Sequence, residues 1–476
     1  MNGQSWDLLV VGAGPAGLAG AVAARRLGLS VLVVDEQTDP GGHFYRHAGV
    51  PAGLREGLLG PDAREGEALV RAFSASGASF RPETLVWQLG RASGGGWRVQ
   101  LAEGPGRERA WSAQAGAVLL ATGAQERPFP VPGWTLPGVM GLGGAQLMLK
   151  TTGLVPAPET VLVGGGPLLY LFAYQLLLAG RRVQALVETA PPGALGSAFP
   201  FLPAALGGAG QLLKGVRMLA ALRRARIPRH RCASRIQVLG GGAAEAVQFQ
   251  AGGGQRTLDT PLVLLHQGLV PGTSLGRTLG CDLLWDPLRA CWRPRVDAWG
   301  RSSVAGVWIA GDGAAVGGAR LARQAGTLAA LDIAAEAGRL DPVRREALAR
   351  PERRGARGPR AVGEFLDHFY LPPPELRRPA DPVVVCRCEE VTAGEIRTLA
   401  GQGCAGPNQL KAFSRCGMGP CQGRFCGTAV TELMAEAQGR DPADVGHFRI
   451  RPPVKPIPLA ALAAAAAPAE RGDFPS

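Results

Sequence analysis

The chain has 476 residues, and its 46% of hydrophobic residues can bury two or three cores of ordinary domain size. The longest apolar run of interest, Leu168–Leu178, is too short to cross a bilayer, so the composition predicts a multidomain globular protein. The formal net charge of +13 comes almost wholly from arginine and concentrates at 214–235 and 344–360. No nucleic-acid motif accompanies these stretches, so we expect solvated basic faces and no nucleic-acid binding; an acidic partner or peripheral membrane association stays open.

The N-terminus predicts a cytoplasmic protein. Its opening residues, MNGQSWDLLVVGAGPAG, have no basic segment before the apolar run and lead straight into a strand and turn, unlike a signal peptide. In a reducing compartment, clustered cysteines are more often metal ligands or catalytic thiols than disulfides.

The first predicted unit is a strand, Leu8–Val11, a glycine-rich turn, a helix and a second strand, Val31–Val34. In such a turn the first glycine permits the bend, the second lets a pyrophosphate approach the backbone, and the third lets helix and strand pack closely. The acid after the second strand binds the adenosine ribose, and Asp35 precedes Glu36 in that place. The order of parts predicts a dinucleotide-binding unit with turn residues Gly12, Gly14, Pro15, Ala16 and Gly17.

Two later strands return the chain to this unit. The strand Ala117–Leu120 ends in Ala121-Thr122-Gly123, and the strand Val307–Ala310 ends in Gly311-Asp312-Gly313. Because ligands bind outside the carboxyl ends of strands in open α/β sheets, both turns are expected to touch the same nucleotide.

A second glycine-rich turn follows about 150 residues after the first, in TVLVGGGPLLYLFAYQLLLAGRRVQALVE. Gly164 and Gly166 match the first two glycines and Glu188 ends the next strand, but Leu169 stands where the third glycine belongs. We expect a Rossmann-like domain without a tightly bound nicotinamide. If NAD(P) does bind, Glu188 favours the unphosphorylated form by repelling a 2′-phosphate.

The fold class predicted is α/β, with two Rossmann-like dinucleotide-binding domains and a small C-terminal helical domain. Residues after about 340 are rich in Arg and Pro, show little periodicity and are interpreted as a linker. The Pro/Ala-rich tail is expected to lie over another surface or to be disordered at its end. The boundaries are 1–150 and 271–340 for the first domain, 151–270 for the second, 341–382 for the linker, 383–445 for the cysteine domain and 446–476 for the tail.

Six of the nine cysteines lie between residues 386 and 426, and Cys232, Cys281 and Cys291 are isolated thiols without a predicted role. Thr392–Glu395 is predicted to be a capping box that opens one helix, and Gly427 opens another. Cysteines near helix N-termini suit an anionic centre, and four thiolates can hold either zinc or a [2Fe-2S] cluster.

The tight pair Cys386 and Cys388 supplies two ligands. For the second pair, spacing alone leaves both Cys416 with Cys421 and Cys421 with Cys426 open, because each pair has four residues between its members. The position of Cys426 directly before a helix favours Cys421 and Cys426.

Several motifs resemble one family closely: ATGAQERPFPVPGWTLPGVMGLGGAQ, CRCEEVTAGEI, RCGMGPCQGRFCG and RPPVKPIPL. They are similar to the flavoprotein subunit of heteromeric opine oxidases, hydrogen cyanide synthases and hydroxyproline dehydrogenases. The resemblance implies FAD and a [2Fe-2S] domain of the bacterioferritin-associated-ferredoxin type with ligands at both ends of CQGRFC, which leaves Cys416 and Cys404 as bystanders. Another adenine nucleotide in one of the two nucleotide sites stays open. It assigns FAD contacts to Gly12, Gly14, Gly17, Asp35, Thr122, Gly123 and Asp312. The loop at Gly42 and His43 departs from the family, which has Gln where this chain has His43.

The resemblance further implies a function and partners. Substrate oxidation at a C–N bond of an opine, imino acid or other secondary amine is expected on an amine-oxidase-like (DAO-type) flavoprotein partner, and a small ferredoxin-like protein is a further candidate partner. This chain would pass electrons through FAD and [2Fe-2S] to a respiratory acceptor. A self-contained NADH-dependent reductase, which Leu169 argues against, and a nucleotide-stabilised scaffold are the alternatives.

Overall fold

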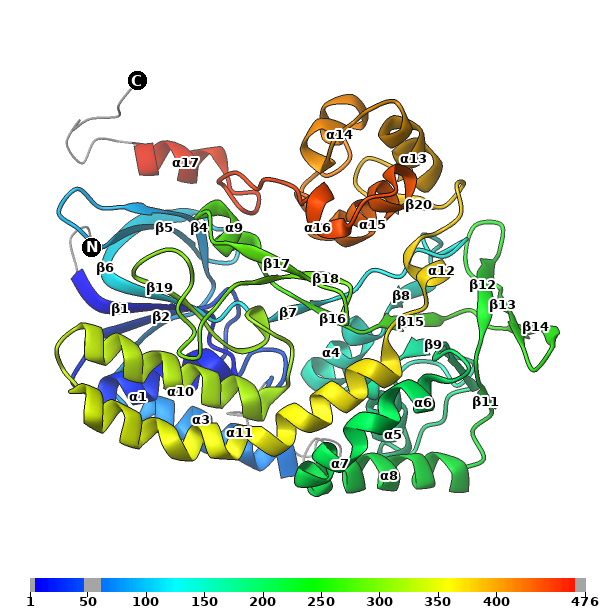
Figure 1. Ribbon diagram of the computed structural model, residues 1–476, viewed down its shortest axis with the longest axis horizontal. Coiled ribbons are helices and arrows are strands. Elements are labelled where there is room, and N and C mark those ends of the chain that lie inside the picture. The colour runs from blue at the N-terminus through cyan, green and yellow to red at the C-terminus, as the bar shows by residue number, and fades with distance from the viewer. Residues whose placement is uncertain (1–4, 47–60, 467–476) are drawn as a thin grey trace.

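The computed structural model describes residues 5–46 and 61–466. It contains two α/β units, a small helical domain that carries the clustered cysteines, and a C-terminal segment that runs back along the first unit (Figure 1). This is the α/β fold with two Rossmann-like domains that the sequence predicts. No helix within the described ranges is both long and apolar enough to cross a membrane.

The first sheet is built from two separate parts of the chain. Its strand order is β3-β2-β1-β6-β5-β4, and β19 pairs in parallel with the last residues of β6. The carboxyl-terminal halves of the central strands are apolar and buried because both faces of the sheet are covered there. The strands are β1 (Ser5–Val11), β2 (Val31–Val34), β3 (Ser79–Arg81), β4 (Thr84–Arg91), β5 (Trp97–Glu103), β6 (Arg109–Leu120) and β19 (Val307–Ile309).

Three helices cover one face of this sheet: α1 (Pro15–Arg26), α3 (Pro61–Ser74) and α10 (Ala319–Glu336). The helices α1 and α10 cross closely because small residues meet at the crossing. A Cβ added at Gly326 would lie 2.0 Å from the Ala16 carbonyl oxygen. The last helix of the first domain is therefore fixed directly on its first glycine-rich turn.

The second sheet is parallel, with the order β11-β10-β9-β15-β8. One face is covered by α4, α5 and α8 and the other by the antiparallel strands β12–β14. The strand β8 belongs to this sheet and the helix α4 packs on it, although the predicted boundary at residue 150 assigns both elements to the first domain. The elements are β8 (Val139–Gly141), α4 (Leu142–Thr152), β9 (Val161–Gly165), α5 (Pro167–Leu178), β10 (Ala185–Glu188), α8 (Ala209–Arg224), β11 (Arg229–His230), β12 (Ser234–Leu239), β13 (Ala246–Ala251), β14 (Gly254–Asp259) and β15 (Val263–Gln267).

Short elements join the two units. The strand β7, directly after Gly123, pairs with β16, and a hairpin of β17 and β18 extends from this junction toward the cysteine domain (Figure 1). The bounds are β7 (Ala124–Glu126), α6 (Ala194–Ala198), α7 (Leu202–Ala205), β16 (Leu269–Pro271), α9 (Ser274–Thr278), β17 (Leu283–Asp286) and β18 (Cys291–Pro294).

The segment predicted as an Arg/Pro-rich linker with little periodicity is mostly one helix, α11 (Pro342–Tyr370). Asp341 caps the helix by accepting a hydrogen bond from the Arg344 N–H, and two internal prolines do not end it. Gly358 lets it approach the second unit, since a Cβ there would lie 2.4 Å from the Gly207 carbonyl oxygen. The buried stripe consists of small and β-branched residues, which gives a weak sequence signal: Ala349, Ala356, Pro359 and Val362.

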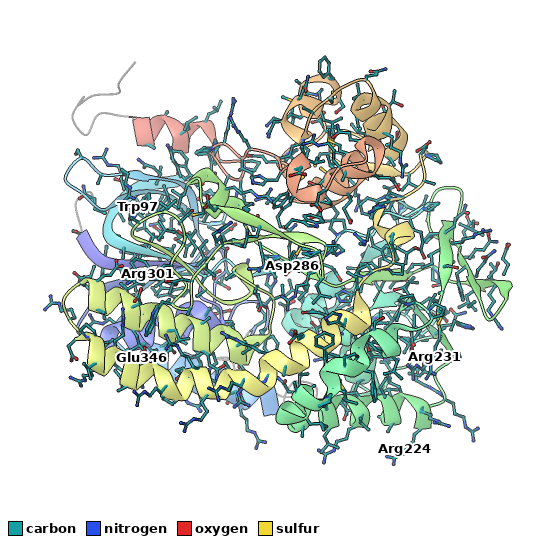
Figure 2. All side chains as sticks on the ribbon, in the orientation of Figure 1. Trp97, Arg224, Arg231, Asp286, Arg301 and Glu346 are labelled. Carbon is teal, nitrogen blue, oxygen red and sulfur yellow. The ribbon has the colours of Figure 1, made fainter. Side chains whose placement is uncertain are left out.

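The two basic stretches lie on α8 with the strands that follow it, and on α11. Arg224, at the end of α8, lies at the outer edge of the second unit (Figure 2). On α11, Arg353 Nη1 lies 2.6 Å from Glu346 Oε1 in a partly exposed pair. Both stretches carry exposed arginines, as predicted.

The cysteine domain packs four helices and a two-stranded ribbon around its own core. The predicted capping box is confirmed: the Thr392 hydroxyl accepts from the Glu395 N–H, and the Glu395 carboxylate accepts from the Thr392 N–H. A helix begins at Gly427, as predicted. The short helix α12 (Pro374–Arg377) precedes the domain, whose elements are β20 (Val384–Cys386), β21 (Val391–Thr392), α13 (Ala393–Gly401), α14 (Pro407–Ser414), α15 (Gly427–Gln438) and α16 (Pro442–Val445).

The C-terminal strap, residues 447–466, begins in the cysteine domain, where Phe448 belongs to the core, and from Ile450 on it lies over the first unit, in line with the predicted covering of another surface. Residues 467–476 of the predicted tail are outside the described ranges. Ile450 and Val454 are buried in the first domain's core, and the Val454 N–H donates to the Trp87 carbonyl at 3.2 Å. The strap ends in α17 (Leu459–Ala466), which contacts β6.

We expect Phe448→Ala to destabilise the cysteine domain by about 3–5 kcal/mol, the usual cost of removing a buried aromatic ring. Phe448 is 1% exposed, and its ring fills the space that side chains on Gly417 and Gly423 would need. Hydrogen exchange of the α15 amides measures the change, and Phe413→Ala, at a ring that is 67% exposed, is the matched control. Equal protection in the two variants would contradict the packing role of Phe448.

Candidate nucleotide and metal sites

The first glycine-rich turn has the geometry of a dinucleotide site. A Cβ at Gly12 would lie 2.4 Å from the Ala121 carbonyl oxygen, and one at Gly17 would lie 1.9 Å from the Gly12 carbonyl oxygen. These two glycines are thus required by packing. A Cβ at Gly14 would meet only Gly42 Cα, at 3.9 Å, so this turn leaves open space where a pyrophosphate can approach the backbone.

Asp35 turns back toward the glycine-rich turn. Its Oδ2 accepts from the Ala13 N–H at 2.6 Å, and its Oδ1 accepts from the Gln37 N–H at 2.8 Å. Burial raises the pKa of Asp35, and these two hydrogen bonds oppose that rise. The carboxylate therefore stands at the strand end where an adenosine ribose is expected.

Glu36 faces another surface. Its carboxylate pairs with Lys455 Nζ of the strap at 2.5 Å and with Arg107 Nη2 at 3.2 Å. A cavity of about 350 Å³ lies beside this cluster of charges. Glu36 therefore anchors the strap, and Asp35 is the better placed of the two predicted ribose ligands.

The two later turns lie side by side at the same sheet edge. A Cβ at Gly313 would lie 3.2 Å from Thr122 Oγ1. Asp312 Oδ1 accepts from the N–H groups of Gly317 and Gly318 at 2.9 and 3.1 Å, and burial raises the pKa of Asp312. The predicted residues Ala121, Thr122, Gly123, Gly311 and Asp312 thus lie in two adjoining turns.

The loop at Gly42 and His43 forms a wall of the same site. A Cβ at Gly42 would lie 2.8 Å from Gly14 Cα, and its φ of +60° also favours glycine. The His43 side chain is exposed, while the Lys150 ammonium donates to its carbonyl oxygen at 3.2 Å.

The second glycine-rich turn is backed by a histidine that the sequence did not single out. A Cβ at Gly164 would lie 1.7 Å from the His266 carbonyl oxygen, and one at Gly166 would lie 3.5 Å from His266 Nε2. His266 Nδ1 lies 2.6 Å from Glu126 Oε1, and Glu126 also accepts from the Gly143 N–H at the start of α4. This cluster links β7 to the second sheet.

The acid of the second turn is already paired. Arg229 Nε lies 2.5 Å from Glu188 Oε1, and Glu188 is buried. Tyr370, from the end of α11, closes the turn, since a Cβ at Gly165 would lie 3.7 Å from its ring. Leu169 is fully buried in the core under the turn. Because Arg229 already pairs with Glu188, the carboxylate expected to bind a ribose in the second site is engaged within the protein.

The cysteine site is a pocket of about 220 Å³. Cys386 and Cys426 are buried at its base, Cys421 is partly exposed and Cys388 is exposed. A Cβ at Gly419 would lie 2.2 Å from Cys388 Cβ, so only glycine lets this loop close over the site. All four predicted metal ligands line the pocket together with two other side chains. The lining residues are Cys386, Arg387, Cys388, Cys421, Phe425 and Cys426.

Cys416 lies behind this pocket rather than in its lining. It is fully buried, and the sulfur atoms of Cys386, Cys416 and Cys426 lie within 4.8 Å of one another. Hydrogen bonds from the thiols of Cys416 and Cys426 lower the pKa of Cys386 to about 2. Five cysteines thus converge, while Cys404 is buried in the domain core.

Comparisons with known proteins agree with this arrangement. Residues 6–329 match the model of the pyridine nucleotide-disulphide oxidoreductase family, and residues 383–466 match that of the sarcosine oxidase A3 domain. The opine oxidase A-subunit of Rhizobium meliloti is 44% identical over 96% of this chain and 98% of its own. The chain belongs to the opine oxidase A-subunit family.

One further relative and one solved structure are similar to this chain over most of its length. Hydrogen cyanide synthase subunit HcnB of Pseudomonas aeruginosa is 34% identical over 95% of this chain and 97% of its own. The L-proline dehydrogenase of P. horikoshii has the same fold, with a TM-score of 0.68 at 18% identity over 96% of this chain and 79% of that structure. This member of the opine oxidase A-subunit family is therefore an oxidoreductase subunit with a flavoprotein fold.

The contacts that join the nucleotide and cysteine sites of this opine oxidase A-subunit family member were not predicted from its sequence. Arg229 and Tyr370 close the second turn, and Trp134 and Phe425 stack between the units. These contacts join residues far apart in the chain, so local sequence patterns do not predict them. The only signal was that Trp134 and Phe425 each lie in a motif that resembles the family.

We expect Gly14→Ala to weaken flavin binding by about tenfold or more, because overpacking against a bound group typically costs about 1–3 kcal/mol. Flavin released on denaturation and flavin titration of the apoprotein measure this. Gly17→Ala, whose Cβ clashes with the protein itself, should instead lower thermal stability. A Gly14→Ala protein with full flavin affinity would show that no pyrophosphate approaches this glycine.

Proposed function

We propose that this chain is the FAD- and [2Fe-2S]-containing electron-transfer subunit of a heteromeric dehydrogenase or oxidase. The complex acts on an opine, an imino acid or another secondary amine and passes electrons to a respiratory acceptor. The observation that carries the proposal is the direct contact between the nucleotide unit and the cysteine pocket within one chain: the Gln125 amide donates to the Arg424 carbonyl.

The first turn suits FAD. Its open side at Gly14, the Asp35 carboxylate and the adjoining turns at Thr122 and Asp312 match the pyrophosphate, ribose and ribityl ends of such a dinucleotide. When bound, the flavin supplies two-electron acceptance and one-electron release. The chain itself contributes the N-terminus of α1 and a buried acid beside it, which orient the cofactor.

The cysteine pocket suits a [2Fe-2S] cluster held by Cys386, Cys388, Cys421 and Cys426. All four line one pocket, and Cys426 directly precedes α15, whose N-terminus stabilises thiolate charge. Zinc would use the same number of thiolates, but the one-residue spacing of Cys386 and Cys388 is unusual for it. A reduced flavin can pass single electrons to an iron–sulfur cluster but not to zinc, so the neighbouring nucleotide unit favours a [2Fe-2S] cluster.

The second nucleotide-like site does not act as a tight nicotinamide site in this proposal. Glu188, which would bind the ribose, is held by Arg229, and Tyr370 packs against the turn. The NADH-reductase alternative would need this ion pair to open.

Substrate chemistry is assigned to an amine-oxidase-like partner in a cytoplasmic heteromeric complex, since we assign no general base among the described residues. A docking surface is available on α6–α8, where large apolar side chains are exposed beside arginines, a composition typical of interfaces. Leu195, Phe199, Leu206 and Val216 are 60–63% exposed there.

The purified chain should contain one flavin and two irons with two sulfides, and two variants test the ligands. Cys426→Ala should lose the cluster's visible absorption and the EPR signal of its reduced form, because a pocket-lining thiolate is lost. Cys416→Ala should keep both. Loss in Cys416→Ala with retention in Cys426→Ala would exchange their roles, and a colourless protein with one zinc would refute the cluster.

Anaerobic mixing distinguishes the electron donors. The chain alone should keep its flavin oxidised for seconds with either NADH or an opine, because Arg229 already pairs with Glu188, the ribose-binding acid of the second site, and the proposal places the substrate base on the partner. Co-expression with the amine-oxidase-like partner should allow the opine to bleach the flavin. Millisecond bleaching of the chain alone by NADH would establish the reductase alternative, and bleaching by an opine would place substrate oxidation on this chain.

A further inference from the structure

The cysteine domain packs against residues 121–138, here called the connecting segment. This segment starts at the Thr122–Gly123 turn of the nucleotide site. Gln125 in this segment donates its side-chain amide to the Arg424 carbonyl, within the loop between Cys421 and Cys426. The loop therefore contacts the nucleotide unit three residues after Thr122. No other chain is needed to bring the two sites together.

Trp134, near the end of the connecting segment, contacts both sides of the cysteine pocket. Its ring stacks on Phe425, with centroids 6.1 Å apart and planes within 8°. Its indole Nε1–H donates to the Val384 carbonyl at 2.7 Å, and the Arg387 guanidinium lies 5.2 Å from its ring. Phe425 adjoins Cys426, and Arg387 adjoins Cys386. One indole ring therefore contacts both segments that carry the predicted ligands.

This contact is buried and is held from two sides. Trp134 is 5% exposed and belongs to the core between the second sheet and β12–β14. The strap holds the same loop from its other side, where Gln422 donates to the Pro453 carbonyl at 2.6 Å and Arg424 Nη1 donates to the Val454 carbonyl at 3.3 Å. The pocket is thus clamped between the connecting segment and the strap.

We propose that Trp134, through its stack on Phe425, is the positioning residue that sets electron transfer between the flavin and the cysteine-bound cluster. The inference rests on the proposed function. Reduced flavin releases two electrons and two protons, and the cluster takes one electron at a time, passing each to a one-electron acceptor before the next arrives. The rate of each transfer falls steeply with the distance between the flavin and the cluster. Because the stack of Trp134 on Phe425 holds the cysteine loop in position, it sets this distance and therefore the rate.

The test uses the full chain with both cofactors. A flash of light with a deazaflavin and a sacrificial amine injects single electrons, and the flavin and cluster absorbances report their redistribution. Trp134→Leu should slow flavin-to-cluster transfer several-fold, because loss of the stack on Phe425 lets the cysteine loop move away from the nucleotide unit and electron transfer slows as the distance grows. Trp134→Phe, which keeps an aromatic ring for the stack, should restore most of the rate.

Cofactor content and midpoint potentials separate positioning from damage. In Trp134→Leu, flavin, iron and both potentials should stay at wild-type values, so that only the rate changes. If Trp134→Leu fails to fold, Phe425→Leu tests the same stack from the exposed side, and Phe413→Leu is the matched control in the same domain. An unchanged rate in a fully loaded Trp134→Leu or Phe425→Leu protein would overturn the inference. A wild-type chain that lacks flavin or iron would instead overturn the proposed function.

Discussion

The connecting segment, residues 121–138, makes close contacts with all three units. It begins with the Ala121 carbonyl pressed against Gly12, where only a glycine fits. It continues through Glu126, which binds the start of α4 and contacts His266, and Trp134, which stacks on the cysteine loop. One short stretch therefore sets the position of all three units relative to one another.

The first nucleotide unit could be predicted from the sequence because its requirements are local. The close approaches at Gly12 and Gly17 tolerate no side chain, and the fully buried strands around them are continuous apolar runs. The second site could not be judged in the same way. Its glycines are equally recognisable, but its state depends on Arg229 and Tyr370, which reach Glu188 and Gly165 from other elements.

The helix α11 and the cysteines show the same limit. Pro351 and Pro359 argue against a helix in sequence, yet α11 runs through both because its small residues fit against α10 and the second unit. Spacing alone makes Cys416 and Cys426 equivalent partners of Cys421. The position of Cys426 before a helix favours it in the sequence, and the fold adds that Cys426 lines the pocket whereas Cys416 is buried outside the lining.

The discontinuity of the first domain has a consequence for biosynthesis. The strand β19 and helix α10, which complete the sheet and cover the first turn, lie in residues 307–336, after the whole second unit. A ribosome has therefore released the glycine-rich turn long before Gly326 can close on Ala16. The nucleotide site is finished late, and its cofactor must enter a chain whose second unit already exists.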